Sequence, residues 1–124
     1  QAVEAGLAAS VHGVYRGGLG IHLAWAAMAG GLGLKVDLEA VPVEGAERPD
    51  QRLFSESAGR FIVTVDPARQ AAFEALLAGL PWARVGEVTE EPLLRITGPG
   101  GARLVNLNVA DLQAAWRKPL GGLV

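Results

Sequence analysis

Two short stretches of the sequence combine residue types that could bind a ligand. The first, His12-Gly13-Val14-Tyr15-Arg16-Gly17-Gly18-Leu19, places an imidazole and a guanidinium beside a pair of glycines. A β-rich segment, a glycine turn and the start of a helix follow one another here, an order that presents free backbone N–H groups to an anion. The stretch matches neither common phosphate-loop pattern. The residues alone therefore favour the alternative, in which the glycines only let a helix pack against a strand.

The second stretch is Ser55-Glu56-Ser57, with Arg60 close behind it. Two hydroxyls and a carboxylate just before a buried strand could bind a polar ligand or hold a metal-bound water. The alternative is an ion pair between Glu56 and Arg60, four residues apart, together with a serine cap. This local interpretation is favoured, because such pairs are common. His22, inside an apolar helix, is interpreted as a core or interface histidine, since no partner at metal-ligand spacing accompanies it.

The composition excludes several function classes. The chain has no cysteine, hence no disulfide, thiol nucleophile or thiolate metal site, which is compatible with a cytoplasmic protein. A formal net charge of -2 argues against a nucleic-acid partner. No apolar run reaches the roughly 18–20 residues that cross a bilayer. No Gly-x-Ser-x-Gly pattern is present, and only 2 histidines could assist a serine. We therefore assign no catalytic residue and no metal ligand, and we expect neither a nucleic-acid nor a membrane partner.

Hydrophobic periodicity predicts the elements that would position these stretches. Strands are predicted over residues 11–15, 34–38, 60–65, 82–88, 93–97 and 103–109, and helices over 1–10, 21–29, 67–80 and 111–116. Asp66 and Pro67 have the residue types of an N-cap and a first helical position, and Asp111 is expected to cap the last helix. Residues 42–51 are predicted to form an exposed loop, 52–57 a helical turn, and 98–101 a hairpin-like turn.

This order of elements predicts an α+β fold, with a mixed β-sheet covered by helices and related to ferredoxin-like folds. At 124 residues we expect a single domain, residues 1–124. The first residues have the pattern of a helix whose start is missing, so we expect a fragment of a larger chain. The high hydrophobic content and the alanine-rich helices further predict an exposed apolar face and self-association of the isolated domain.

The same stretches resemble a known family. The run His12-x-x-x-x-Gly17-Gly18-Leu19, the alanine-rich helix after it and Gly31-Leu32-Gly33 are similar to the C-terminal domains of the aminoimidazole ribonucleotide synthetase superfamily. Within that superfamily, residues 53–57 followed by 60–65, and the ending 112–116, resemble the phosphoribosylformylglycinamidine synthases, in particular the last domain of their large subunit. The resemblance covers nearly the whole chain.

The resemblance implies a reaction and its partners. Such ligases use ATP to phosphorylate the amide oxygen of formylglycinamide ribonucleotide, and ammonia released from glutamine displaces the phosphate to give the amidine. ATP and Mg²⁺ are expected mostly on another domain of the full-length enzyme, and ammonia comes from a glutaminase domain or subunit. A domain like this one forms a scaffold or a wall of the cleft and is inactive alone. The residues expected to contact substrate or phosphate are His12, Arg16, Gly17, Gly18, Ser55, Glu56 and Ser57.

The loop departs from the family pattern at two positions. An aspartate commonly follows the histidine and an acidic residue commonly precedes the two glycines, where this chain has Gly13 and Arg16. The departure argues against metal binding and leaves an anion-binding or a purely structural role. Hydrogenase-maturation and selenophosphate synthetase-like enzymes use similar loops and are alternatives. A stand-alone ligand- or partner-binding module of the same fold is a further one.

Overall fold

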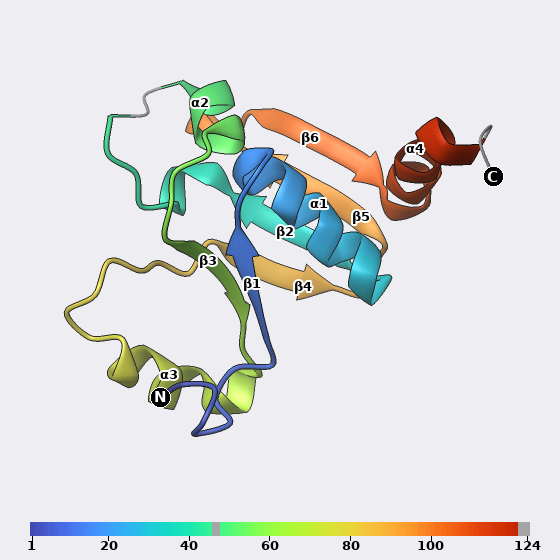
Figure 1. Ribbon diagram of the computed structural model, residues 1–124. Coiled ribbons are helices and arrows are strands. Elements are labelled where there is room, and N and C mark those ends of the chain that lie inside the picture. The colour runs from blue at the N-terminus through green and yellow to red at the C-terminus, as the bar shows by residue number, and fades with distance from the viewer. Residues whose placement is uncertain (46–47, 122–124) are drawn as a thin grey trace.

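The structure is a computed structural model that describes residues 1–45 and 48–121. Its strands are β1 (Ser10–Val14), β2 (Gly33–Asp37), β3 (Arg60–Thr64), β4 (Gly86–Thr89), β5 (Leu93–Thr97) and β6 (Arg103–Asn108). Its α-helices are α1 (Gly18–Gly30), α2 (Pro49–Phe54), α3 (Gln70–Leu76) and α4 (Val109–Gly121) (Figure 1). Short 3-10 turns cover Leu38–Ala40, Pro67–Arg69 and Pro99–Gly101.

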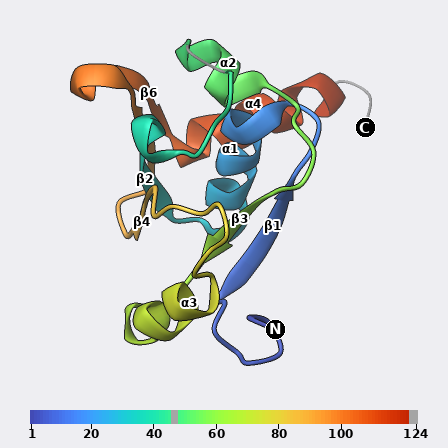
Figure 2. The same ribbon diagram turned by 90° about the vertical axis from the view of Figure 1, so that its left-hand side faces the viewer.

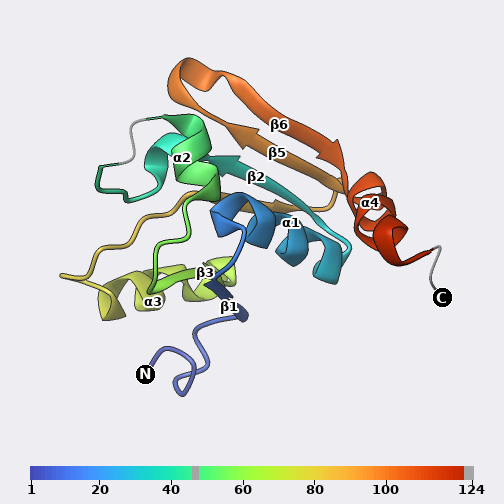
Figure 3. The same cartoon turned by 45° about the horizontal axis from the view of Figure 1, so that its top comes forward.

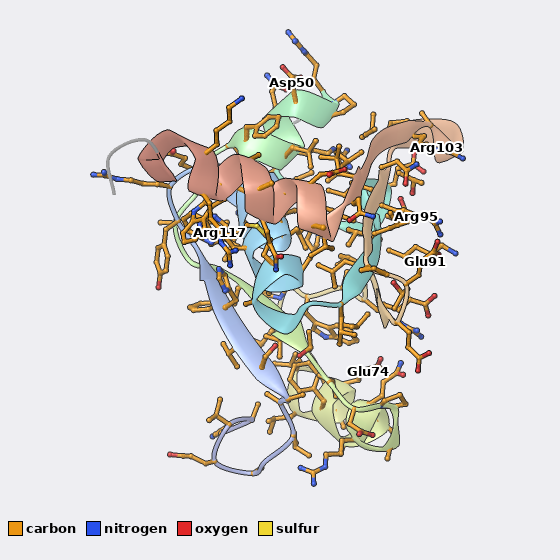
Figure 4. The ribbon with its side chains drawn as sticks, turned by 90° about the vertical axis from the view of Figure 1, so that its right-hand side faces the viewer. Asp50, Glu74, Glu91, Arg95, Arg103 and Arg117 are labelled. Carbon is orange, nitrogen blue, oxygen red and sulfur yellow. The ribbon has the colours of Figure 1, made fainter. Side chains whose placement is uncertain are left out.

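A mixed four-stranded sheet carries most of the core. Its order is β4-β2-β5-β6, with β2 parallel to β5 and the other neighbours antiparallel. Along β2 the buried Leu34 and Val36 alternate with the exposed Lys35, because successive side chains of a strand point to opposite faces. The apolar face packs against α1. The opposite face is charged: the Arg95 guanidinium lies 3.2 Å from the Glu91 carboxylate, and both point away from α1 (Figure 4).

The helix α1 lies between this sheet and a separate two-stranded ribbon, β1–β3 (Figure 2). The helix is apolar on nearly all sides, as expected for a helix enclosed between two layers. Leu19, Leu23 and Ala27 recur at four-residue spacing and are buried, and so is the polar His22. The ribbon pairs its strands antiparallel over five positions, from Ser10 opposite Thr64 to Val14 opposite Arg60.

The helices α3 and α4 lie at opposite ends of the molecule. α4 continues from the end of β6 (Figure 3). The Gln113 side-chain amide donates to the carbonyl of Met28 in α1 at 3.2 Å. α3 lies at the opposite end beside the N-terminal segment, where the Arg69 guanidinium donates to the carbonyl of Gly6. Among the described residues, every helix is too short or too polar to traverse a lipid bilayer.

The structure confirms the α+β class and most predicted elements. The strands β1, β2, β3, β5 and β6 lie where periodicity places them, and residues 98–101 connect β5 and β6 as an antiparallel hairpin. The Asp66 carboxylate accepts from the backbone N–H of Ala68 at 2.8 Å, so the predicted cap exists. It caps a 3-10 turn that leads into α3.

Four local predictions were wrong. No helix forms over residues 1–9, of which 2–6 form turns: Gly6 adopts φ 68°, and Val3 is 68% exposed, so a helix here would have no core to pack on. The strand predicted over 82–88 is limited to β4, residues 86–89. A helix, α2, begins at Pro49 inside the predicted loop. The last helix begins at Val109, and its cap is Asn108, whose side-chain oxygen accepts from the N–H of Ala110 at 2.8 Å.

Candidate functional site

The turn between β1 and α1 depends on two glycines with left-handed backbones. Gly17 has φ 89° and Gly18 has φ 76°, a region that costs other residues about 1–2 kcal/mol. A Cβ at Gly18 would lie 2.7 Å from the backbone carbon of Phe54 and 2.8 Å from the carbonyl oxygen of Leu53. Gly18 therefore lets the start of α1 pack directly on the end of α2. Gly18 thus has a close-packing role, but its partner is a helix and not the expected strand.

The two stretches singled out in the sequence meet at this turn. The backbone N–H of Gly17 donates to Glu56 Oε1 at 2.9 Å, and that of Gly18 donates to the carbonyl of Tyr15 at 3.2 Å. The first turn of α1 contains no acidic residue of its own. The Glu56 carboxylate supplies the negative charge that the positive end of a helix dipole favours. Two of the amides expected to meet an anion are therefore already bonded within the chain.

The histidines His12 and His22 contact each other below the turn. His12 Nε2 lies 2.7 Å from His22 Nδ1, and the two rings meet edge-on with centroids 4.9 Å apart. His22 is 2% exposed, and its Nε2 accepts the backbone N–H of Tyr15 at 2.9 Å. The interpretation of His22 as a hydrogen-bonded core residue is confirmed. The sequence did not predict that His22 contacts the loop. The only sequence signal for this contact was the presence of two histidines ten residues apart.

Arg16 is the cation that this turn exposes. Its side chain lies at the surface, and within the described part of the chain no hydrogen bond or ion pair engages its guanidinium. Its neighbour Tyr15 is 69% exposed. The ring of Tyr15 lies over Gly13, where a Cβ would come within 2.6 Å of it. The turn thus presents an arginine and an aromatic ring to the outside.

Around Ser55 the local ion-pair interpretation is wrong. Arg60 Nη2 donates to the carbonyl of Ser55 at 2.6 Å and lies 3.4 Å from its hydroxyl, so the guanidinium binds Ser55 and forms no ion pair with Glu56. Arg60 Nε is buried and has no hydrogen-bond partner. The Glu56 carboxylate bonds instead to the backbone N–H of Gly17 at the start of α1. Ser57 is exposed to solvent.

Nothing around the turn fits a metal ion. One carboxylate is engaged by a backbone amide, and the two imidazoles engage each other. No group of three or more His, Cys, Asp or Glu side chains gathers anywhere in residues 1–45 and 48–121. A shallow cavity of about 280 Å³ lies elsewhere, at the carboxyl ends of β2 and β5. Its charged lining residues are Lys35, Asp37, Arg84 and Glu87.

Comparison with known proteins gives the same relatives by sequence and by structure. The family model described as "AIR synthase related protein, C-terminal domain" matches residues 1–98. The "Phosphoribosylformylglycinamidine synthase subunit PurL" of Deinococcus radiodurans is 38% identical over 122 residues, which is 98% of this chain and 16% of that protein. The protein of the same name from Limosilactobacillus reuteri is 41% identical over 118 residues, 95% of this chain and 15% of that protein. The chain therefore spans about a sixth of the length of these relatives.

Among solved structures, PurL of Thermotoga maritima complexed with FGAR superimposes with a TM-score of 0.77 at 27% identity, over 90% of this chain and 19% of that chain. The same protein complexed with ATP also gives a TM-score of 0.77. The HypE–HypF complex matches with a TM-score of 0.64 at 21% identity, over 79% of this chain and 35% of that chain, which indicates a shared fold only.

Proposed function

This chain belongs to the family of AIR synthase-related C-terminal domains, and from that premise we propose that it is the C-terminal domain of a phosphoribosylformylglycinamidine synthase. That cytoplasmic ligase uses ATP and glutamine to convert formylglycinamide ribonucleotide into formylglycinamidine ribonucleotide in purine biosynthesis. One observation carries the proposal: two relatives of this name match 98% and 95% of the chain at 38% and 41% identity. Residues 1–124 then form one domain of a longer protein.

Within that enzyme the domain acts as a scaffold and a wall of the substrate cleft. Two loop amides, those of Gly17 and Gly18, are bonded to Glu56 and Tyr15, so this turn offers few free donors to a nucleotide phosphate. The donor set around the turn does not fit Mg²⁺, and we derive no step through ATP or its metal here. We assign both to the remaining domains, and the supply of ammonia to a glutaminase domain or subunit. Alone, this domain is expected to be inactive.

Arg16 is the side chain through which the domain would meet an anionic substrate. Its charge is exposed and unpaired in the described structure, and it stands at the rim of the turn. A guanidinium can form two parallel hydrogen bonds to a phosphate. The other predicted residues then shape the loop. His12 contacts His22, and the backbone N–H of Gly17 bonds to Glu56. Gly18 allows the close contact with α2. Ser55 anchors Arg60, and Ser57 remains a candidate for direct contact.

A domain exchange tests the function. The matching segment of the Deinococcus radiodurans relative is replaced by this chain, and the purified chimera is assayed with formylglycinamide ribonucleotide, ATP and ammonia. We expect the chimera to make the amidine, and this chain alone to make none. A folded chimera without activity would contradict the proposal, and so would turnover by this chain alone. The chimera carrying Arg16→Ala serves as the matched variant, and we expect it to show a raised KM for the ribonucleotide.

A further inference from the structure

The buried ring of His22 faces two backbone groups that make opposite demands on one nitrogen. His22 Nε2 lies 2.9 Å from the backbone nitrogen of Tyr15, which donates, and 3.1 Å from the carbonyl oxygen of Arg16, which accepts. A ring nitrogen carries either a lone pair or a proton, so it satisfies only one of these groups at a time. The protonation of Nε2 therefore selects which part of the Tyr15–Arg16 turn His22 binds.

The neutral pair has one consistent assignment in the observed geometry. Because the N–H of Tyr15 points at His22 Nε2, that nitrogen is the acceptor and the ring proton is on Nδ1. His22 Nδ1–H then donates to His12 Nε2 at 2.7 Å, and His12 carries its own proton on Nδ1. In this state the Arg16 carbonyl faces a lone pair and gains nothing from the ring.

We propose that His12 and His22 form a proton-operated switch of the glycine turn. When the pair takes up one proton, the proton on His22 Nδ1 crosses the 2.7 Å hydrogen bond to His12 Nε2, and the added proton is bound at His22 Nε2. His12 then carries the positive charge, on a ring that is half-buried, and His22 stays neutral in its core position. His22 Nε2–H donates to the Arg16 carbonyl, and the Tyr15 N–H loses its acceptor.

The His22 ring contacts groups from β1, from the turn and from its own helix. The groups that face His22 from β1 and the turn are His12, Tyr15 and Arg16, and Trp25 of the same helix packs edge-on with its centroid 4.9 Å away. Two charged groups lie on the neighbouring segments: Glu56, bonded to Gly17 from the segment after α2, and Arg60 of β3, which pairs opposite Val14.

The bond from Gly17 to Glu56 holds the helix end of the turn in place. A change of partner at His22 therefore acts on two peptides: the N–H of Val14–Tyr15 loses its acceptor, and the carbonyl of Arg16–Gly17 gains a donor. The exposed side chains of Tyr15 and Arg16 are attached between these two peptides. The switch follows from the geometry of this chain and does not depend on the proposed reaction. Through this switch, the protonation of the histidine pair would change how the turn presents Arg16 to a ligand.

The test follows ring nitrogens and backbone amides of the ¹⁵N-labelled chain by NMR between roughly pH 8 and pH 5, where imidazoles change charge. We expect His22 Nε2 to change from an unprotonated to a protonated nitrogen, and the Tyr15 amide to shift with the same midpoint. His12 should become doubly protonated in the same step. A Tyr15 amide that stays constant while His12 gains its proton would overturn the switch, as would a His22 Nε2 already protonated at the upper end of the range.

The variant His12→Gln provides the second arm. A glutamine oxygen can still accept from His22 Nδ1–H, but it cannot take up the proton, so the neutral arrangement should persist and the coupled shift of Tyr15 should be lost. Retention of that shift at the same midpoint in His12→Gln would refute the role of His12. Because neither arm measures turnover, failure of the switch and failure of the proposed ligase function are separate outcomes.

Discussion

The carboxylate of Glu56 accepts the backbone N–H of Gly17 at 2.9 Å, although the two residues are 39 positions apart in the sequence. This bond connects the segment after α2 with the first turn of α1. It is the contact that brings the two predicted site stretches together. It also explains why α1 begins without an acidic residue or a capping side chain of its own.

Removing this contact should destabilise the chain. We expect Glu56→Ala to lower the free energy of unfolding by about 0.5–2 kcal/mol, the range measured for lost helix caps. Glu56→Gln keeps an oxygen that accepts from Gly17 and loses only the charge, so its cost should be less than half as large. Urea unfolding followed by circular dichroism gives both values. Equal losses in the two variants would show that charge, and not the hydrogen bond, matters.

A methyl group at Gly18 should be more costly than at another left-handed glycine. Gly18→Ala pays about 1–2 kcal/mol for the backbone conformation and about 1–3 kcal/mol for the clash with the end of α2. Gly31 ends α1 with φ 63°, and a Cβ at this position would meet open space to a distance of 4 Å, so Gly31→Ala has only the first cost. Thermal melts should place Gly18→Ala several degrees below Gly31→Ala. Coincident melting temperatures would contradict the packing argument.

The cluster of buried apolar residues around the sheet should dominate stability, and it includes Leu38 in the 3-10 turn after β2. Leu38 is 0% exposed, so Leu38→Ala should cost about 2–5 kcal/mol through lost burial and the cavity it leaves. The same substitution at Leu80, which is 59% exposed, should stay within about 0.5 kcal/mol. Chemical denaturation of the two variants compares identical chemistry at a buried and an exposed position. A comparable loss at Leu80 would mean that the segment after α3 is packed more firmly than the structure shows.

The outer surface of the β1–β3 ribbon should drive self-association of the isolated chain. Phe61 is 64% exposed and lies opposite Gly13, and Val11, 49% exposed, lies opposite Val63 on the same face. We expect sedimentation equilibrium to show concentration-dependent association that Phe61→Ser reduces. Trp116→Ser, at a 62% exposed aromatic residue of α4, is the control that should leave association unchanged. A chain that stays monomeric at every concentration would contradict the prediction.

Local sequence rules predicted the elements well where neighbours in the chain decide the outcome. Alternation of apolar and charged residues located β2, and Asp66 with Pro67 located the start of the turn before α3. The same rules failed at residues 1–9, where apolar spacing suggested a helix. There the left-handed Gly6 and the absence of a packing surface for Val3 outweigh helix propensity.

The candidate site was predictable only in part, because its decisive contacts are distant in sequence. The glycine pair and the two stretches were visible, but the bond from Gly17 to Glu56 depends on how α2 packs against α1. Arg60 lies at the right spacing to pair with Glu56, yet it turns to the carbonyl of Ser55. Spacing along one segment cannot reveal a competing partner on another.

The ribbon carries a consequence for how the chain folds. Its first pair, Ser10 with Thr64, encloses α1, β2 and α2 in one loop of the chain. Closing so long a loop lowers the chain entropy before stabilising contacts can form, so pairing of distant strands tends to be slow. The ribbon should therefore pair after α1 has packed on its sheet, and its amides should exchange with deuterium before those of the four-stranded sheet in the native protein. The glycine turn, which follows β1 directly, would then acquire its shape later than the sheet and lose it earlier.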